Sequence, residues 1–181
     1  MGAGKSTTGA LLAHALSWRF VDSDAAIEAR AGRTIAQIFA ENGEAAFRAM
    51  EAEVIRSYTA GENLVLALGG GAIEFETTRE VLSRLSEARI VFLDAPLDVM
   101  VARCVAQSGA AERPVLADRE RLSQRFMARL PYYRRAHLTI ATAGLGPEAV
   151  VERILSGLSA AEASGSASAT ACAEEKGLPT R

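Results

Sequence analysis

Residues 2–7 of this chain read Gly2-Ala3-Gly4-Lys5-Ser6-Thr7. They match the second half of the Walker A pattern, in which a glycine-rich turn leads through Gly-Lys-Ser/Thr into a helix. The glycines let backbone N–H groups turn inward around phosphate oxygens, and the helix that begins near Lys5 adds the positive end of its dipole. In this pattern Lys5 reaches the β- and γ-phosphates, and the Ser6 hydroxyl is a ligand of Mg²⁺. The segment therefore predicts a nucleotide-binding phosphate loop that opens an apolar helix.

Two parts of that pattern are missing from the given residues. The first glycine of the Walker A pattern would stand four places before Ala3, and a strand should precede the loop. In P-loop folds that strand lies inside the sheet, so its absence would leave two neighbouring strands unpaired and a gap in the core. We therefore expect the given sequence to be truncated at its N-terminus. If Met1 is the true start, we expect both folding and activity to be impaired.

The composition is that of one globular domain. The chain has 181 residues, of which 49% are hydrophobic and 23% charged, and its formal net charge is −2, which argues against nucleic acid as a partner. Two distant cysteines, Cys104 and Cys172, give neither a disulfide framework nor zinc-ligand spacing. No apolar run approaches the roughly 18 residues that a membrane span needs. We expect a cytoplasmic, monomeric protein without a membrane or nucleic-acid partner.

Apolar periodicity predicts helices that alternate with short strands. The predicted strands are Arg19–Val21, Leu64–Leu68, Arg89–Leu93 and His137–Ile140. The predicted helices are 5–16, 24–30, 35–41, 44–58, 77–85, one beginning at Pro96, 119–129 (broken by Pro131) and 147–158. Strands that are apolar throughout and alternate with helices indicate an α/β fold, a doubly wound parallel sheet with helices on both faces.

Two segments fall outside this pattern. Residues 107–118 lack periodicity and contain Gly109 and Pro114, so we interpret them as a mobile loop. Residues 159–181 are rich in Ala and Ser and cannot bury enough apolar area to offset their ordering entropy. We therefore divide the chain into a domain at residues 1–158 and a disordered tail at residues 159–181.

Asp22 and Asp24 stand two places apart where a strand ends, so both can face the crevice outside its carboxyl end. One carboxylate can hold Mg²⁺ through water, and the other can orient or deprotonate an acceptor hydroxyl. Helix capping explains the same pair equally well.

Two further features suggest a small acidic acceptor. Gly69, Gly70 and Gly71 follow a buried strand and permit close approach of a ligand to the backbone. Arg48 lies on a helix that otherwise buries apolar residues, which suggests a carboxylate partner, with an internal salt bridge to Glu51 or Glu44 as the alternative.

Arginines beyond the acceptor region are the remaining candidates. Arg113 is a candidate lid residue that offsets the charge built up in phosphoryl transfer. Arg121, Arg125 and Arg129 recur every four residues on one helical stripe, and we interpret the first two as a solvated face.

Six motifs, taken in order, resemble the shikimate kinase family. They are G-A-G-K-S-T, V-D-S-D, G-E-A-A-F-R, L-G-G-G-A, E-R-P-V-L and R-L-P-Y-Y, and the resemblance covers about residues 1–155. It implies a nucleoside monophosphate kinase-like domain with a helical substrate-binding region and a lid. It also implies transfer of the γ-phosphate of ATP to the 3-hydroxyl of shikimate, in the pathway to chorismate and the aromatic amino acids.

The resemblance also implies residue roles. Gly2, Ala3, Gly4, Lys5, Ser6 and Thr7 would hold the ATP phosphates, Ser6 and Asp22 would hold Mg²⁺, and Asp24 would bind the acceptor hydroxyls and act as the base. Arg48 and Arg129 would clamp the carboxylate beside Gly69, Gly70 and Gly71, Arg113 would reach the phosphates, and Arg103 would lie along the adenine. Two departures are a long stretch between Arg103 and Arg113 and the absence of a basic residue in the turn at 143–147.

Two alternatives remain. One is a related P-loop kinase acting on gluconate or another hydroxy acid, which the triple glycine and the Asp-Ser-Asp spacing disfavour. The other is a kinase-like module that senses a cyclic acid without turnover, which the complete set Lys5, Ser6, Asp22 and Asp24 disfavours.

Overall fold

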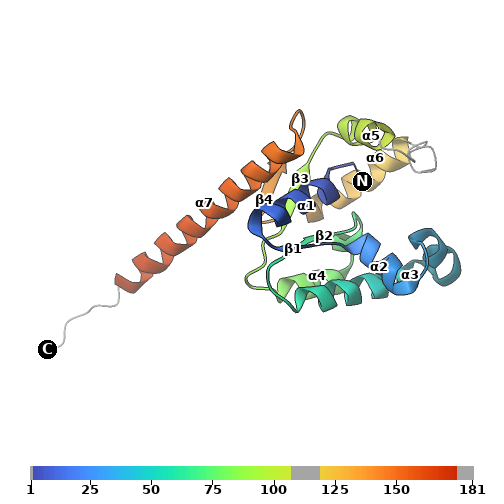
Figure 1. Ribbon diagram of the computed structural model, residues 1–181, viewed down its shortest axis with the longest axis horizontal. Helices are drawn as coiled ribbons and strands as arrows, with labels where there is room; N and C mark the ends of the chain where they lie inside the picture. The colour runs from blue at the N-terminus through green and yellow to red at the C-terminus, as the bar shows by residue number, and fades with distance from the viewer. Residues whose placement is uncertain (1, 107–118, 175–181) are drawn as a thin grey trace.

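A computed structural model describes residues 2–106 and 119–174 of the chain (Figure 1). Helices and parallel strands alternate along it, as predicted. In chain order the elements are α1 Lys5–Leu16, β1 Arg19–Asp22, α2 Ser23–Ala31, α3 Ile35–Thr59, β2 Leu64–Ala67, the short 3-10 helix η1 Ala72–Glu74, α4 Glu76–Ser83, β3 Val91–Asp94, α5 Leu97–Ala106, α6 Arg119–Tyr133, β4 Leu138–Ala141 and α7 Pro147–Glu174.

The four strands form two parallel pairs. β1 pairs with β2, so that Asp22 lies opposite Ala67, and β3 pairs with β4, so that Asp94 lies opposite Ala141. Within the described residues the two pairs form separate two-stranded sheets. Because β1 and β2 are parallel and in register, the residues that follow Asp22 and those that follow Ala67 leave the sheet at the same edge.

Local signals explain where the acceptor-side helices begin and bend. The Asp22 side chain caps α2 by accepting from the backbone N–H of Asp24 at 3.0 Å. Thr34 and Gln37 form a reciprocal capping box at the start of α3. Gly43, with φ 77° and ψ 176°, breaks α3 into the two helical stretches that the sequence predicted.

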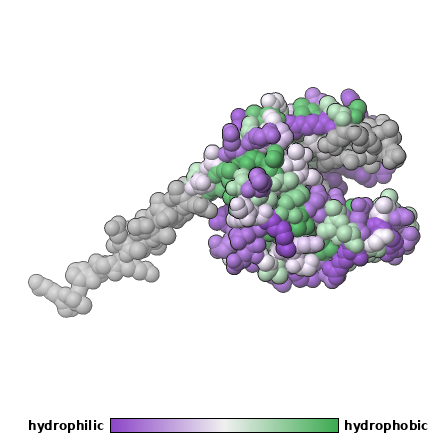
Figure 2. Space-filling view, in the orientation of Figure 1, coloured by the Kyte–Doolittle hydropathy of each residue, from purple (hydrophilic) through white to green (hydrophobic). Residues whose placement is uncertain are grey.

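The core has two main parts. One joins α1, β3, β4 and α7 through Leu12, Leu93, Ile140, Val150, Val151 and Ile154. The other lies between α2 and α3 around Ile27, Ile38, Phe47 and Val54, with Ile55, Ala72 and Val81 packed beyond it. In Figure 2, hydrophobic residues also reach the surface in the middle of the visible face, where Figure 1 draws the strands and α1.

Two helix ends differ from the prediction. α6 was expected to end at Arg129 but continues through Pro131 to Tyr133. Proline is tolerated there because its fixed φ suits a helix and only one hydrogen bond is lost in the last turn. α7 was expected to end at Leu158, before a disordered tail, but continues as helix to Glu174. Its alanines carry the highest intrinsic helix propensity, which favours helix even where little is buried.

Other predicted features lie beyond what this structure tests. The loop at 107–118, with Arg113, and residues 175–181 lie outside the described residues. In the part of the chain that the structure describes, no helix is both long and apolar enough to cross a membrane.

Candidate active site

The predicted phosphate loop leads directly into α1. Gly2 and Gly4 have φ angles of 71° and 89°, a backbone conformation that favours glycine, and α1 begins at Lys5. A Cβ on Gly2 would lie 2.2 Å from the backbone oxygen of Met100 on α5, so the loop also needs glycine for space. The loop and the N-terminus of α1 have the form that binds phosphate groups.

Asp22 lies beside this loop and has two contacts. Its Oδ2 accepts a hydrogen bond from the Ser6 hydroxyl at 2.6 Å, while its Oδ1 caps α2. The Asp22 carboxylate can therefore cap α2 with one oxygen and still take part in a metal site with the other. The Ser6 and Asp22 oxygens fit Mg²⁺, a hard cation that is usually bound by one or two protein oxygens together with water and substrate phosphates. The described residues contain no cluster of three or more His, Cys, Asp or Glu suited to a metal.

Asp24 faces the interior. Burial raises the pKa of its carboxyl, the nearby Asp22 raises it further, and Lys5 opposes the rise. A Cβ on Gly69 would lie 2.6 Å from Asp24 Oδ1. Asp24 is therefore next to both the phosphate loop and the triple-glycine segment, in surroundings that make it a stronger base than a solvated aspartate.

A cavity of about 150 Å³ lies beside Asp24. Its lining comes from α2, α3 and the triple-glycine segment and consists of Asp24, Ile35, Phe39, Phe47, Arg48, Glu51, Gly69, Gly70 and Gly71. Phe39 and Phe47 form one wall, with ring centroids 4.6 Å apart. Apolar walls with a few charged groups are typical of a small-molecule site.

Arg48 is held in this cavity by two aromatic rings and two carboxylates, while its Nε has no hydrogen-bond partner among the described residues. Its guanidinium lies over the rings of Phe75 and Phe47, 4.4 and 5.0 Å from their centroids. It donates to Glu51 at 2.8 Å and to Glu44 at 3.2 Å. The internal salt bridges considered as an alternative are thus present, and the pair with Glu51 lies in the lining of the cavity, whereas Glu44 is exposed.

Glu51 is a site residue that sequence reasoning treated only as a salt-bridge partner. It is fully buried, and burial raises the pKa of its carboxyl against the lowering effect of Arg48. Its Oε1 has no hydrogen-bond partner among the described residues and would lie 3.0 Å from a Cβ on Gly69. The spacing of three from Arg48 was the available signal, since it places both residues on one helical face.

Arg129 comes to the same place from α6. A Cβ on Gly71 would lie 3.1 Å from Arg129 Nη2 and 2.6 and 3.0 Å from the two terminal nitrogens of Arg48. The two arginines proposed as a carboxylate clamp therefore converge on Gly71. The φ of Gly71 is −96°, so its glycine is required by space and not by backbone conformation.

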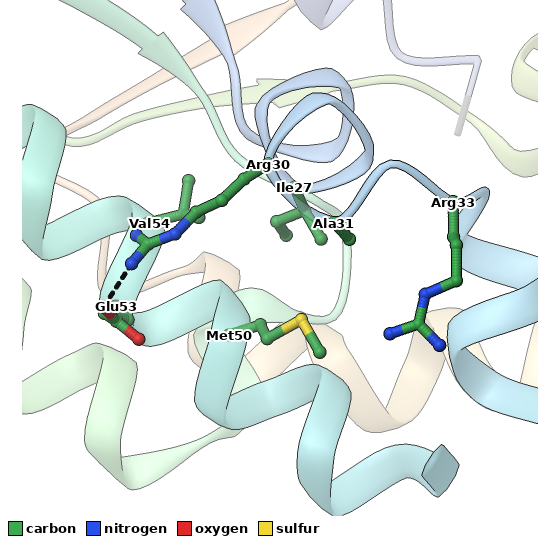
Figure 3. A pocket seen from close by; sticks show the side chains of 7 residues that line it. All are labelled: Ile27, Arg30, Ala31, Arg33, Met50, Glu53 and Val54. Carbon is green, nitrogen blue, oxygen red and sulfur yellow. Dashed lines mark hydrogen bonds and ion pairs between the residues drawn. The ribbon is translucent and has the colours of Figure 1, made fainter. Parts of the chain in front are cut away.

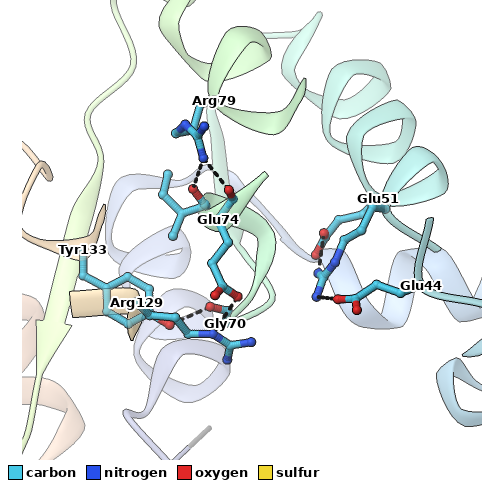
Figure 4. A network of polar contacts seen from close by, with 9 residues as sticks. Glu44, Glu51, Gly70, Glu74, Arg79, Arg129 and Tyr133 are labelled. Atoms are coloured by element: carbon cyan, nitrogen blue, oxygen red, sulfur yellow. Dashed lines mark hydrogen bonds and ion pairs between the residues drawn. The ribbon is translucent and has the colours of Figure 1, made fainter. Parts of the chain in front are cut away.

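Polar contacts that sequence reasoning did not identify surround the triple-glycine segment (Figure 4). Gly69 donates its N–H to the buried Ser23 hydroxyl at 2.9 Å, and the Tyr133 hydroxyl donates to the carbonyl of Gly70 at 2.6 Å. Arg129 Nε donates to Glu74 at 2.7 Å. Most of these pairs lie far apart in sequence, so no local pattern could indicate them.

Arg103 belongs to the other half of the molecule. It donates to the Thr142 hydroxyl at 3.1 Å and to the Thr142 carbonyl at 2.7 Å, just after β4. It is therefore separate from the acceptor cavity, and its role beside the adenine stays a prediction.

A second cavity, of about 180 Å³, lies between α2 and α3 (Figure 3). Ile27, Met50 and Val54 line it together with Arg30 and Arg33. Both arginines already form ion pairs of 2.5 Å, with Glu53 and Glu41 respectively. None of the predicted site residues lines this cavity.

Taken together, the parallel α/β fold, the phosphate loop and the adjacent acidic and basic groups define a P-loop phosphotransferase. The family model for shikimate kinase matches residues 1–159. The chain belongs to the shikimate kinase family.

Individual shikimate kinases of known sequence support this family assignment. The shikimate kinase of Symbiobacterium thermophilum is 42% identical over 159 residues, which cover 86% of this chain and 90% of the relative. That of Persephonella marina is 38% identical over 157 residues, covering 86% of this chain and 92% of the relative.

Solved structures agree as well. Shikimate kinase from Acinetobacter baumannii, in complex with shikimate, has a TM-score of 0.77 and 37% identity, with 86% of each chain covered. Shikimate kinase from Bacteroides thetaiotaomicron has a TM-score of 0.79 and 32% identity, covering 88% of this chain and 94% of its own. The resemblance, the fold class and the enzyme class predicted from the sequence are confirmed, and the family's phosphate donor is ATP.

Proposed function

We propose that this chain transfers the γ-phosphate of ATP to the 3-hydroxyl of shikimate, giving shikimate 3-phosphate and ADP. The observation that supports this most is the position of Asp24. It is close enough to Lys5 and Asp22 of the phosphate side for both to affect its pKa, and it lines the cavity that holds Arg48 and Glu51. One carboxylate thus lies where a phosphate donor and a hydroxyl acceptor would meet.

On the donor side, the backbone of residues 2–7 and the Lys5 side chain bind the ATP phosphates. Ser6 and Asp22 would hold Mg²⁺, which would neutralise phosphate charge when bound. Arg103 would lie along the adenine, and Arg113, which lies outside the described residues, would bind the phosphates.

On the acceptor side, Arg48 and Arg129 bind the carboxylate of shikimate beside Gly71. Bidentate pairing with guanidinium groups suits a planar carboxylate. The backbone of Gly69–Gly71 contacts the ring, because the absence of side chains lets a ligand approach.

The chemical step uses Asp24 as the base. Asp24 accepts the proton of the 3-hydroxyl while that oxygen forms a bond to the γ-phosphorus, and the bond between the γ-phosphorus and the bridging oxygen of ADP breaks. Lys5 and the N-terminus of α1 offset the negative charge on the transferring group. We further propose that the enzyme acts as a monomer in the cytoplasm.

A coupled ADP-release assay tests this function. The full chain is incubated with ATP and Mg²⁺ and with shikimate, gluconate or no acceptor, and Asp24→Asn is the control for chemistry. We expect ADP release that depends on shikimate and is lost in the variant. Release with gluconate alone would favour a different hydroxy-acid kinase, and binding of shikimate without any release would favour the sensor.

A further inference from the structure

We propose that Glu74 is a positioning residue that sets the affinity for the acceptor's carboxylate by holding the Arg129 guanidinium. The inference rests on the proposed role of Arg129 in binding that carboxylate. Glu74 itself lies on η1, immediately after the triple-glycine segment, and needs no contact with the substrate to act.

The backbone around Glu74 is fixed by two sets of hydrogen bonds. Its N–H donates to the carbonyl of Gly71 at 3.1 Å. Arg79 of α4 donates to the carbonyls of Ile73, at 3.1 Å, and of Glu74. η1 is therefore a rigid base from which the Glu74 side chain reaches α6.

The Glu74 carboxylate engages one edge of the guanidinium. It accepts from Arg129 Nε at 2.7 Å, whereas Arg129 Nη2 faces the position of a Gly71 Cβ, where the Arg48 nitrogens also converge. Figure 4 shows Glu74 with Arg129 on one side of the view and Glu44 with Glu51 on the other. Glu74 thus fixes the orientation in which Arg129 presents its terminal nitrogen toward the clamp.

A separate contact holds the helix that carries Arg129. The Tyr133 hydroxyl donates to the Gly70 carbonyl, and its ring stacks on Phe92 at 5.0 Å. Burial raises the pKa of the Tyr133 phenol, so it remains a donor at neutral pH. Arg129 lowers the pKa of the same phenol, so the Tyr133 side chain also lies beside the guanidinium. Because Tyr133 holds α6, loss of the Glu74 side chain should remove the anionic partner of Arg129 Nε and loosen the guanidinium without moving the helix.

Two opposing effects decide whether the affinity for shikimate falls or rises when Glu74 is replaced. Removing Glu74 leaves more positive charge near the acceptor, which favours an anion, but it also restores rotational freedom to a long side chain that binding must then order. The side chains of Arg129 and Glu74 are 26% and 29% exposed, so solvent screens the charge effect. We therefore expect the loss of orientation to dominate.

The test compares Glu74→Ala and Glu74→Gln in steady-state kinetics. For Glu74→Ala we expect KM for shikimate to rise about 5- to 20-fold, within the range of coupling between contacting residues, with kcat and KM for ATP nearly unchanged. For Glu74→Gln we expect KM within about 2-fold of the unmodified chain, because the amide oxygen still accepts from Nε. Glu76→Ala, which removes the same charge from an exposed position two residues away, is the matched control and should change nothing.

Two further arms exclude a merely structural effect. With the methyl ester of shikimate, which lacks the anionic carboxylate, Glu74→Ala should have no effect on KM. In an Arg129→Met background, Glu74→Ala should likewise add nothing. An unchanged or lowered KM for shikimate in Glu74→Ala, or the same rise with the ester, would overturn the inference. Failure of the proposed function would instead appear as no shikimate-dependent ADP release from the unmodified chain.

Discussion

Asp24 is the residue at which the donor and acceptor sides meet. Burial and the neighbouring Asp22 raise the pKa of its carboxyl above the ordinary value of 3.8, so the charged form is disfavoured in the folded state. The cost to stability is fully present above the folded-state pKa and is relieved as the pH falls through it. A partly buried carboxylate that lowers the stability of the fold is a candidate for a catalytic role.

Asp24→Asn should therefore remove turnover and stabilise the fold at pH 7. We expect Tm to rise by on the order of a few degrees, since about 1 kcal/mol corresponds to about 2–4 °C in a chain of this size. The gain should shrink as the pH is lowered through the folded-state pKa and vanish below about the unfolded value. Thermal melts at several pH values measure it, and a gain that grows toward acid pH would contradict the assignment.

Gly71 is required because two guanidinium groups occupy the space of its missing side chain. Gly71→Ala should displace the flexible ends of Arg48 and Arg129 while leaving the backbone unstrained, since φ is −96°. We expect KM for shikimate to rise about 10-fold or more, as for other losses of paired charge, with little change in KM for ATP or in Tm.

The control for this variant is Gly61→Ala, whose nearest heavy atom to the new Cβ is 4.0 Å away. Equal effects of the two substitutions on KM for shikimate would show that Arg48 and Arg129 do not form the clamp.

Whether the sequence could predict a site residue depends on how far along the chain its partners lie. Lys5, Ser6 and Asp24 belong to short motifs whose geometry is local, so their positions follow from spacing alone. Glu74 and Tyr133 act through partners 55 and 63 residues away, and only the packing of α6 on η1 brings these pairs together.

Among the elements, α3 depends on one backbone position. Gly43 has φ 77° and ψ 176°, a region that is essentially restricted to glycine, and nothing lies within 4 Å of a Cβ built there. The sequence predicted the break because a glycine separates two apolar helical patterns. It could not predict that the second helix would carry Phe47, Arg48 and Glu51 into one cavity.

Gly43→Ala should destabilise the protein by about 1–3 kcal/mol through backbone strain alone. Urea unfolding measures the change, with Gly61→Ala as a control at a position without unusual φ. KM for shikimate should rise as well, because the break sets the direction in which Arg48 enters the cavity. A variant as stable as the unmodified chain would show that the bend is not intrinsic to Gly43.

The ends of α6 and α7 show where local rules mislead. Pro131 is a helix breaker in general, yet it lies in the last turn of α6, where little is lost. The alanine-rich segment of α7 beyond Leu158 was predicted to be disordered because it has few large apolar residues. The high helix propensity of alanine favours helix there instead. The residue at which such a helix ends depends on small differences between opposing contributions to the free energy of folding.

At the scale of the whole molecule, the site lies between two packed units. The core of α1, β3, β4 and α7 supports the phosphate loop and Arg103, and the core of α2, α3, η1 and α4 supports the acceptor cavity. The alternation of strands and helices was predictable, and so was the parallel pairing. The way in which α6 joins the acceptor side through Arg129 and Tyr133 was not, because it depends on side chains from three elements.

The most direct test of the account is identification of the product. The full chain is incubated with ATP, Mg²⁺ and shikimate, and ³¹P NMR follows the phosphorus signals while ADP is quantified. We expect one phosphate monoester at the 3-position of shikimate, formed in equal amount with ADP and absent in Asp24→Asn. Formation of ADP with inorganic phosphate alone, or of equal ADP without shikimate, would contradict it.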